Sequence, residues 1–169
     1  MTSIASKRTI ALADFSTTAS TTSTDGTVNT LYSATVPAGA VARPGDKLMF
    51  EFNGTLAAHA TATRRLAVQL GSQAVYGPIA AAVAVTAGGY WQIRGYVMAT
   101  GDATAVVTSE VLISDATGTV TCHQVSTVAW TPAWTSDITM YLKAQAAGTG
   151  AAAADISATS GYLLVMPAA

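Results

Sequence analysis

Charged residues are scarce in this chain of 169 residues. Only 10% of them are Asp, Glu, Lys or Arg, whereas an average soluble domain has about 25%. The 8 basic and 9 acidic residues leave a formal net charge of -1. The sequence therefore lacks the basic footprint of a nucleic-acid-binding protein and the polybasic segment of a membrane-surface protein. We expect no nucleic-acid partner and no membrane partner, and a surface of small neutral residues that other proteins could cover.

Cysteine and histidine are almost absent. Cys122 is the single cysteine, so it cannot form an intrachain disulfide and is expected to be a buried thiol. Its neighbour His123 would point to the opposite face of a strand, so the two cannot act as thiolate and base. His59 lies in a predicted loop. Because no CxxC, HExxH or Asp-rich calcium loop occurs, the sequence predicts no metal site and no cofactor.

Paired catalytic groups and long apolar runs are also missing. No nucleophile with a base and no pair of carboxylates is evident, so we expect that the protein is not an enzyme. The longest apolar run, residues 79–85, is mostly alanine and far shorter than the roughly 20 residues that cross a bilayer. The first ten residues are polar and contain Lys7 and Arg8, which does not match a secretory signal.

Strict alternation of apolar and polar residues is what the sequence does have, most clearly in residues 31–56. Leu48, Phe50 and Phe52 fall on one face of a predicted strand, and Glu51 falls on the other. Several Pro and Gly residues and Asp46 precede this strand. Asp46 has a side chain that can close a turn on its own backbone. We interpret the segment as two strands joined by a turn-rich crossing.

The rest of the chain repeats this alternation. Roughly eight to ten strands separated by turn signals, with no sustained helical period, predict an all-β fold. We expect a single-domain, two-sheet β-sandwich, with a jelly roll preferred over an immunoglobulin-like Greek key. Residues 1–26 are interpreted as a polar N-terminal arm, or a short strand plus a Ser/Thr loop, and residues 27–169 as the sandwich.

A few polar residues and aromatics are candidates for contacts. Glu51 is expected on a solvent face, opposite Arg64 or Arg65. Those two arginines are adjacent in a strand and face opposite ways, and for each a solvated side chain is the favoured interpretation. The aromatic residues of the second half could line a sugar-binding face, although core or interface packing is favoured for them. The candidates for stacking on a sugar are Tyr90, Tyr96, Trp130 and Trp134.

Three runs of sequence carry a family resemblance: TVNTLYSATVPAGAVARPGDKLMFEFNGTLA, then TRRLAVQLGSQAVY, and later YWQIRGYVMATGDATAVVTSEVLIS. They resemble a group of tailed-bacteriophage structural proteins with a jelly-roll fold, over roughly residues 27–114. In that group an LYS-tvPa strand leads through a turn into a GD-l-f-f-GtlA strand. Such proteins are capsid decoration or cement proteins, head fibres and receptor-binding modules of tail fibres, and they are commonly homotrimers.

The resemblance implies a structural protein on the virion surface. We expect a homotrimeric capsid decoration protein that stabilises the head by binding between subunits of the major capsid protein. The last strand is apolar on both faces, which is typical of a strand that is central in its sheet or packed against another subunit. Its candidate interface residues are Tyr162, Leu164 and Met166. The alternative is a receptor-binding or carbohydrate-binding module of a phage head or tail fibre, which would bind a host glycan through the stacking aromatics.

Overall fold

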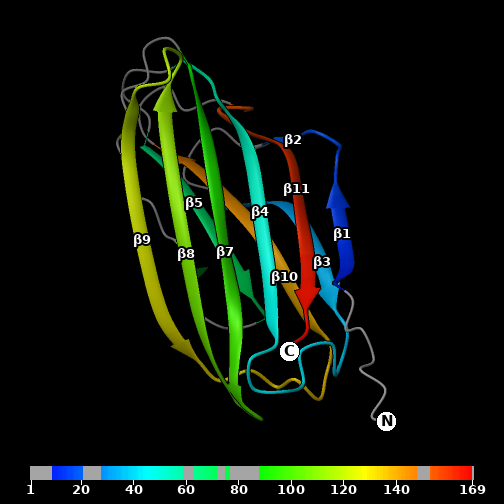
Figure 1. The fold of residues 1–169 in the computed structure, drawn as a ribbon. Helices are drawn as coiled ribbons and strands as arrows, with labels where there is room; N and C mark the ends of the chain where they lie inside the picture. Colours follow the sequence, from blue (N-terminus) through cyan, green and yellow to red (C-terminus); the bar gives the residue numbers. More distant parts are fainter. Residues whose placement is uncertain are drawn as a thin grey trace.

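The chain folds as two antiparallel sheets that pack face to face (Figure 1). The computed structural model describes residues 9–20, 28–58, 63–71, 75–76, 88–147 and 153–168. Within these ranges the chain forms strands and no helix, so the prediction of an all-β two-sheet sandwich is confirmed. No helix that could cross a membrane is found in the described part of the chain.

The larger sheet has the strand order β1-β11-β4-β7-β8-β9, and β2 also pairs with β11. Its strands are β1 (Ile10–Phe15), β2 (Ala19–Ser20), β4 (Lys47–Leu56), β7 (Gly89–Gly101), β8 (Thr104–Asp115), β9 (Val120–Trp130) and β11 (Ile156–Met166). Strands β1 and β2 come from the segment that the sequence assigned to the N-terminal arm or short strand. The larger sheet therefore recruits residues that precede position 27.

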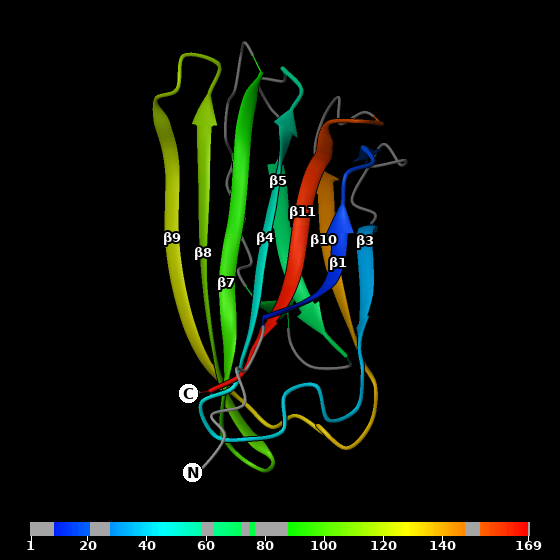
Figure 2. The ribbon, with the colours of Figure 1, turned by 45° about the vertical axis from the view of Figure 1, so that its right-hand side comes forward.

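The smaller sheet has the order β3-β10-β5-β6. Its strands are β3 (Asn29–Val36), β5 (Thr63–Leu70), β6 (Val75–Tyr76) and β10 (Ile138–Ala147). The turned view in Figure 2 shows β5, β10 and β3 as a second layer beside β4, β11 and β1. The apolar faces of the two layers enclose one hydrophobic core.

Strand pairing is nested along the chain. Strand β1 pairs with β11, β3 with β10, β4 with β7, and β5 with β6. This is the pairing of one long antiparallel hairpin that has been folded over on itself. Strands β8 and β9 interrupt the series as a hairpin that extends the larger sheet beyond β7.

The turn-rich crossing leads from β3 in the smaller sheet to β4 in the larger sheet. The Asp46 carboxylate accepts hydrogen bonds from the backbone N–H groups of Ala42 at 3.1 Å and Arg43 at 2.9 Å. It also accepts one from the N–H of Ala168 at 2.7 Å. Asp46 therefore closes the turn on its own backbone, as predicted, and ties the crossing to the residues that follow β11.

Three glycines on the inner face of the larger sheet make room for aromatic rings. Each ring lies directly opposite a glycine of the neighbouring strand: Phe50 opposite Gly95, Phe52 opposite Gly161, and Trp91 opposite Gly54. A methyl group on Gly161 would lie 2.4 Å from the Phe52 ring, well inside van der Waals contact. Glycine at these positions is thus required by the close approach of a ring, which is a known device for packing a sheet face.

Arg64 corrects one prediction. Arg64 and Arg65 do face opposite ways in β5, and Arg65 is exposed, but the Arg64 side chain is 0% exposed. Its Nη2 donates a hydrogen bond to the Ala57 carbonyl oxygen at 2.6 Å, and the buried Asp155 attracts its charge. The interpretation of Arg64 as a solvated residue was therefore wrong, because its partners come from segments that the sequence pattern does not bring together.

Candidate functional site

The best candidate for a functional site is the outer face of the larger sheet. The smaller sheet covers the inner face, and the alternate residues of β11, β4, β7 and β8 point outward. The registers of these four strands place their outward residues in straight rungs across the sheet. This face carries a charged row with a shallow hollow beside it, an apolar belt, and a second hollow beside Tyr90.

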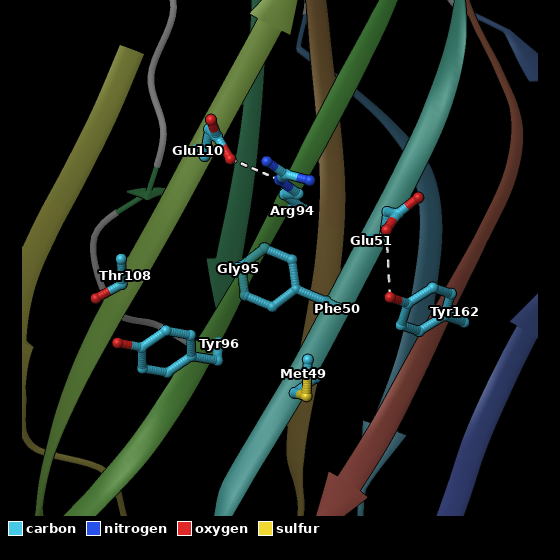
Figure 3. Close-up of a pocket in the computed structure, with 9 residues that line it drawn as sticks. All are labelled: Met49, Phe50, Glu51, Arg94, Gly95, Tyr96, Thr108, Glu110 and Tyr162. Carbon is cyan, nitrogen blue, oxygen red and sulfur yellow. Dashed lines mark hydrogen bonds and ion pairs between the residues drawn. The ribbon is translucent and has the colours of Figure 1, made fainter.

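The charged row consists of Tyr162, Glu51, Arg94 and Glu110, which lie side by side on the four strands (Figure 3). The Tyr162 hydroxyl donates a hydrogen bond to Glu51 Oε2 at 3.2 Å. Arg94 Nε donates to Glu110 Oε2 at 2.5 Å in an ion pair whose side chains are 51% and 24% exposed. An exposed pair of this kind contributes about 0 to 1 kcal/mol, so the row orders the surface more than it stabilises the fold.

The pKa of the Tyr162 hydroxyl reflects this environment. Burial raises the pKa first, and the negative charge and hydrogen bond of Glu51 raise it further, while the charge of Arg94 lowers it. The phenol therefore stays protonated and remains a hydrogen-bond donor to Glu51. The positive charge of Arg94 lies between two carboxylates, so it does not offer an uncompensated cation to an anionic ligand.

A shallow hollow of about 350 Å³ lies beside the charged row. Phe50 and Gly95 lie at its floor, and Met49, Tyr96 and Thr108 are also among its lining residues (Figure 3). The Phe50 ring reaches toward Gly95 of the neighbouring strand, where a side chain would collide with it. The floor is therefore apolar and tightly packed, and the carboxylates of the rim are already engaged with neighbouring side chains.

The apolar belt occupies the next two rungs along the same face. We use this name for six half-buried or exposed side chains, which are Leu164, Met49 and Tyr96 in one rung and Met166, Met98 and Val106 in the other. The one charged side chain within it is Lys47, whose Nζ lies 5.4 Å from the centroid of the Tyr96 ring. This distance is that of a cation-π contact. In the strand register Lys47 lies between Met166 and Met98, so the second rung of the belt contains one charged group, which extends toward Tyr96.

The Tyr90 hollow lies at the opposite end of the face and has a volume of about 500 Å³. The Tyr90 side chain is 57% exposed, because its two cross-strand neighbours, Thr55 and Ser114, are small. The lining residues of the Tyr90 hollow are Asn53, Gly54, Thr55, Tyr90, Trp91, Gln92, Leu112, Ser114, Gly118, Val120 and Thr159. None of these residues is charged.

The predicted interface residues share this outer face. Tyr162 belongs to the charged row, and Leu164 and Met166 belong to the apolar belt, whereas Leu163 and Val165 point into the core. The structure thus brings these three residues together with Tyr96.

The sugar-stacking prediction fails for both tryptophans. Trp130 and Trp134 are 6% and 5% exposed, and their rings pack edge to face with centroids 5.3 Å apart. Neither ring can stack on a ligand, and the favoured interpretation of core packing holds for them. Tyr90 and Tyr96 both lie on the outer face, but in different features.

No cluster of three or more potential metal ligands is found among the residues that the structure describes. His59 lies outside the described residues. Cys122 and His123 belong to β9, and their side chains lie outside what the structure describes.

The charged row was not predicted from the sequence, although its pair of Arg94 and Glu110 could have been. Arg94 and Glu110 lie eight residues on either side of Asp102, which lies in the turn between β7 and β8. A hairpin about that turn places them opposite each other, as the register shows. The predicted partner of Glu51 was wrong, because Arg94 lies opposite Glu51 in the register, and neither Arg64 nor Arg65 does. That pairing joins β4 to β7, which no local signal predicts.

Comparison with known proteins does not add to this picture, since no protein-family model and no curated protein matches the chain.

Proposed function

We propose that this protein is a structural protein of a bacteriophage virion, namely a homotrimeric capsid decoration protein that binds between subunits of the major capsid protein. The nested strand pairing supports the fold part of this proposal. A jelly roll built from two Greek keys requires the first strand to pair with the last, the second with the next to last, and so on inward. The sequence resemblance to phage jelly-roll proteins supports the assignment to the virion surface.

The observation that carries the proposal is the apolar belt. Methionine and aromatic residues are enriched at the centres of protein interfaces, and the belt holds three of the chain's five methionines, Met49, Met98 and Met166. Its side chains lie in two adjacent rungs on the outer face of the larger sheet, with Lys47 between Met166 and Met98. Such an arrangement provides a mainly apolar surface that a second copy of the chain can cover.

The belt would form the centre of the trimer contact and not all of it. A stable interface buries about 800 Å² on each partner, which is more than two rungs of side chains can supply. The charged row borders the belt and would form a polar rim, with Tyr162 at its end. A closed trimer uses the same pair of complementary patches three times. Because the surrounding surface carries little charge, repulsion between the copies is avoided.

The proposal is tested by mass and by capsid binding. We expect the purified protein to be a trimer by light scattering at micromolar concentration, and to bind capsids that lack it. Leu164→Lys places a charge in the centre of the belt and should produce monomers. The matched control is Thr127→Lys, an exposed residue of β9 on the same face but outside the belt, which should remain trimeric.

Two results would contradict the proposal. A wild-type protein that is monomeric and does not bind such capsids is not a trimeric decoration protein. The location of the protein in the particle distinguishes a decoration protein from a fibre module. Many copies on the head indicate a decoration protein, and a few copies at the tail indicate a fibre module.

A further inference from the structure

The geometry of the Tyr90 hollow points to a binding site for an uncharged sugar. We infer that the ring of Tyr90 stacks on one face of a pyranose while the polar groups around it bind the sugar hydroxyls. This inference does not depend on trimer formation or on capsid binding, because the hollow lies within one copy of the chain.

The exposed ring is the first part of the argument. A tyrosine that is 57% exposed on a sheet face presents a large apolar surface to solvent. The cross-strand neighbours of Tyr90 are the small residues Thr55 and Ser114, so neither neighbour covers the ring. The phenolic hydroxyl adds a donor and an acceptor at the ring's edge.

Two amide side chains are held in place beside the ring. Asn53 Nδ2 donates a hydrogen bond to Glu51 Oε1 at 3.1 Å, and Gln92 Nε2 donates to the same oxygen at 3.0 Å. The hydroxyl of Tyr162 holds the other oxygen of this carboxylate. Each amide also has a carbonyl oxygen as an acceptor and a second N–H as a donor. Glu51 therefore acts as a positioning residue that fixes one N–H of each amide from the rung on the side away from Tyr90. The other N–H and the carbonyl oxygen of each amide are the groups that sugar hydroxyls would bind.

The chemistry of the lining selects the class of ligand. The lining combines hydroxyl and amide groups with the Tyr90 ring and the apolar residues Leu112 and Val120, and it has no carboxylate, lysine or arginine among the residues that the structure describes there. An anionic or cationic ligand would lose hydration without gaining a partner, so a neutral ligand is favoured. The volume of about 500 Å³ lies within the range of small-molecule sites and suits one or two sugar rings.

The test uses the full chain and four neutral probes, the methyl glycosides of glucose, galactose, mannose and N-acetylglucosamine. We expect saturation-transfer NMR to detect binding of at least one of them, with a dissociation constant of about 1 mM. Tyr90→Ala should weaken binding at least about tenfold, whereas Tyr90→Phe should retain most of it because the ring remains. Tyr141→Ala is the matched control, since Tyr141 is a half-buried tyrosine of β10 in the smaller sheet, outside both the hollow and the belt.

Several outcomes would overturn the inference. It is wrong if none of the glycosides shows transfer and an array of neutral glycans is also negative. It is equally wrong if Tyr90→Ala binds as tightly as wild type, or if sialylated or sulfated glycans are preferred to neutral ones. Folding of each variant is checked by its thermal transition, and Gln92→Ala provides a second variant, expected to weaken binding, that leaves the ring in place.

Discussion

Substitution of Gly161 by alanine tests the pairing of glycines with aromatic rings in the core. Gly161 lies opposite Phe52 in the pairing of β11 with β4. A methyl group at this position would lie 2.4 Å from Phe52 Cδ1 and 2.7 Å from the Glu51 carbonyl oxygen. Since ordinary contacts of carbon atoms begin near about 3.5 Å, the ring must move by about 1 Å.

The ring has little space in which to move. Phe52 is 1% exposed, and it packs against Phe15 and Phe50 with ring centroids 5.6 Å and 6.3 Å away. Overpacking of a dense core costs about 1 to 3 kcal/mol, while the lower backbone entropy of alanine in the unfolded chain returns about 0.5 to 1 kcal/mol. The contacts at 2.4 Å and 2.7 Å place the overpacking cost at the upper end of its range, so we expect Gly161→Ala to lower the free energy of unfolding by about 2 kcal/mol.

The assay is urea unfolding of the single variants and of a double variant. Phe52→Leu shortens the ring side chain, so Gly161→Ala should cost at least about 1 kcal/mol less in that background than in wild type. Gly118→Ala is a control with positive φ but open space around the methyl group, and its cost reports backbone strain without a clash. Equal costs of Gly161→Ala in the wild-type and Phe52→Leu backgrounds would refute the reasoning.

Three further substitutions test buried or hydrogen-bonded titratable groups. Arg64→Ala should lower the free energy of unfolding by about 3 kcal/mol in urea, because it leaves the buried Asp155 without its cation. Burial and Glu51 raise the pKa of Tyr162, so this group's contribution to stability is present below about pH 10 and lost as the pH rises through the folded pKa. Tyr162→Phe should therefore reduce the loss of unfolding free energy at alkaline pH. An equal loss in the variant and in the wild type would contradict this assignment. Hydrogen bonds lower the pKa of Asp115, so its contribution is present above about pH 4 and lost as the pH falls through the folded pKa. When unfolding is measured at several pH values, Asp115→Asn should lose less unfolding free energy at acid pH than the wild type.

Local patterns were sufficient to predict the strands and their faces. Alternation in β4 placed Leu48, Phe50 and Phe52 inside, and the structure buries all three. The position of Asp46 before the strand indicated a turn, and its carboxylate does accept from the backbone of that turn. These predictions depend on neighbours in sequence, where geometry leaves few choices.

Pairings between distant segments could not be predicted in this way. Phe52 and Gly161 meet because β4 and β11 are adjacent, and nothing near either residue indicates that contact. Arg64 was expected in solvent because its attraction to Asp155 exists only once β5 and the loop before β11 come together. Trp130 is equally ambiguous from the sequence, since an aromatic residue at a strand end can face either a ligand or the core.

The apolar belt and the Tyr90 hollow can be occupied at the same time. Tyr96 of the belt and Tyr90 are six residues apart on β7, and a strand rises about 3.3 Å per residue, so they are separated by about 20 Å. We expect Leu164→Lys to abolish the trimer while leaving sugar binding unchanged, and Tyr90→Ala to weaken sugar binding while leaving the trimer intact. Light scattering and saturation-transfer NMR on the same samples measure both properties. If Leu164→Lys removed both, the site would need a residue from a neighbouring copy, and the assignment of the hollow to a single chain would be wrong.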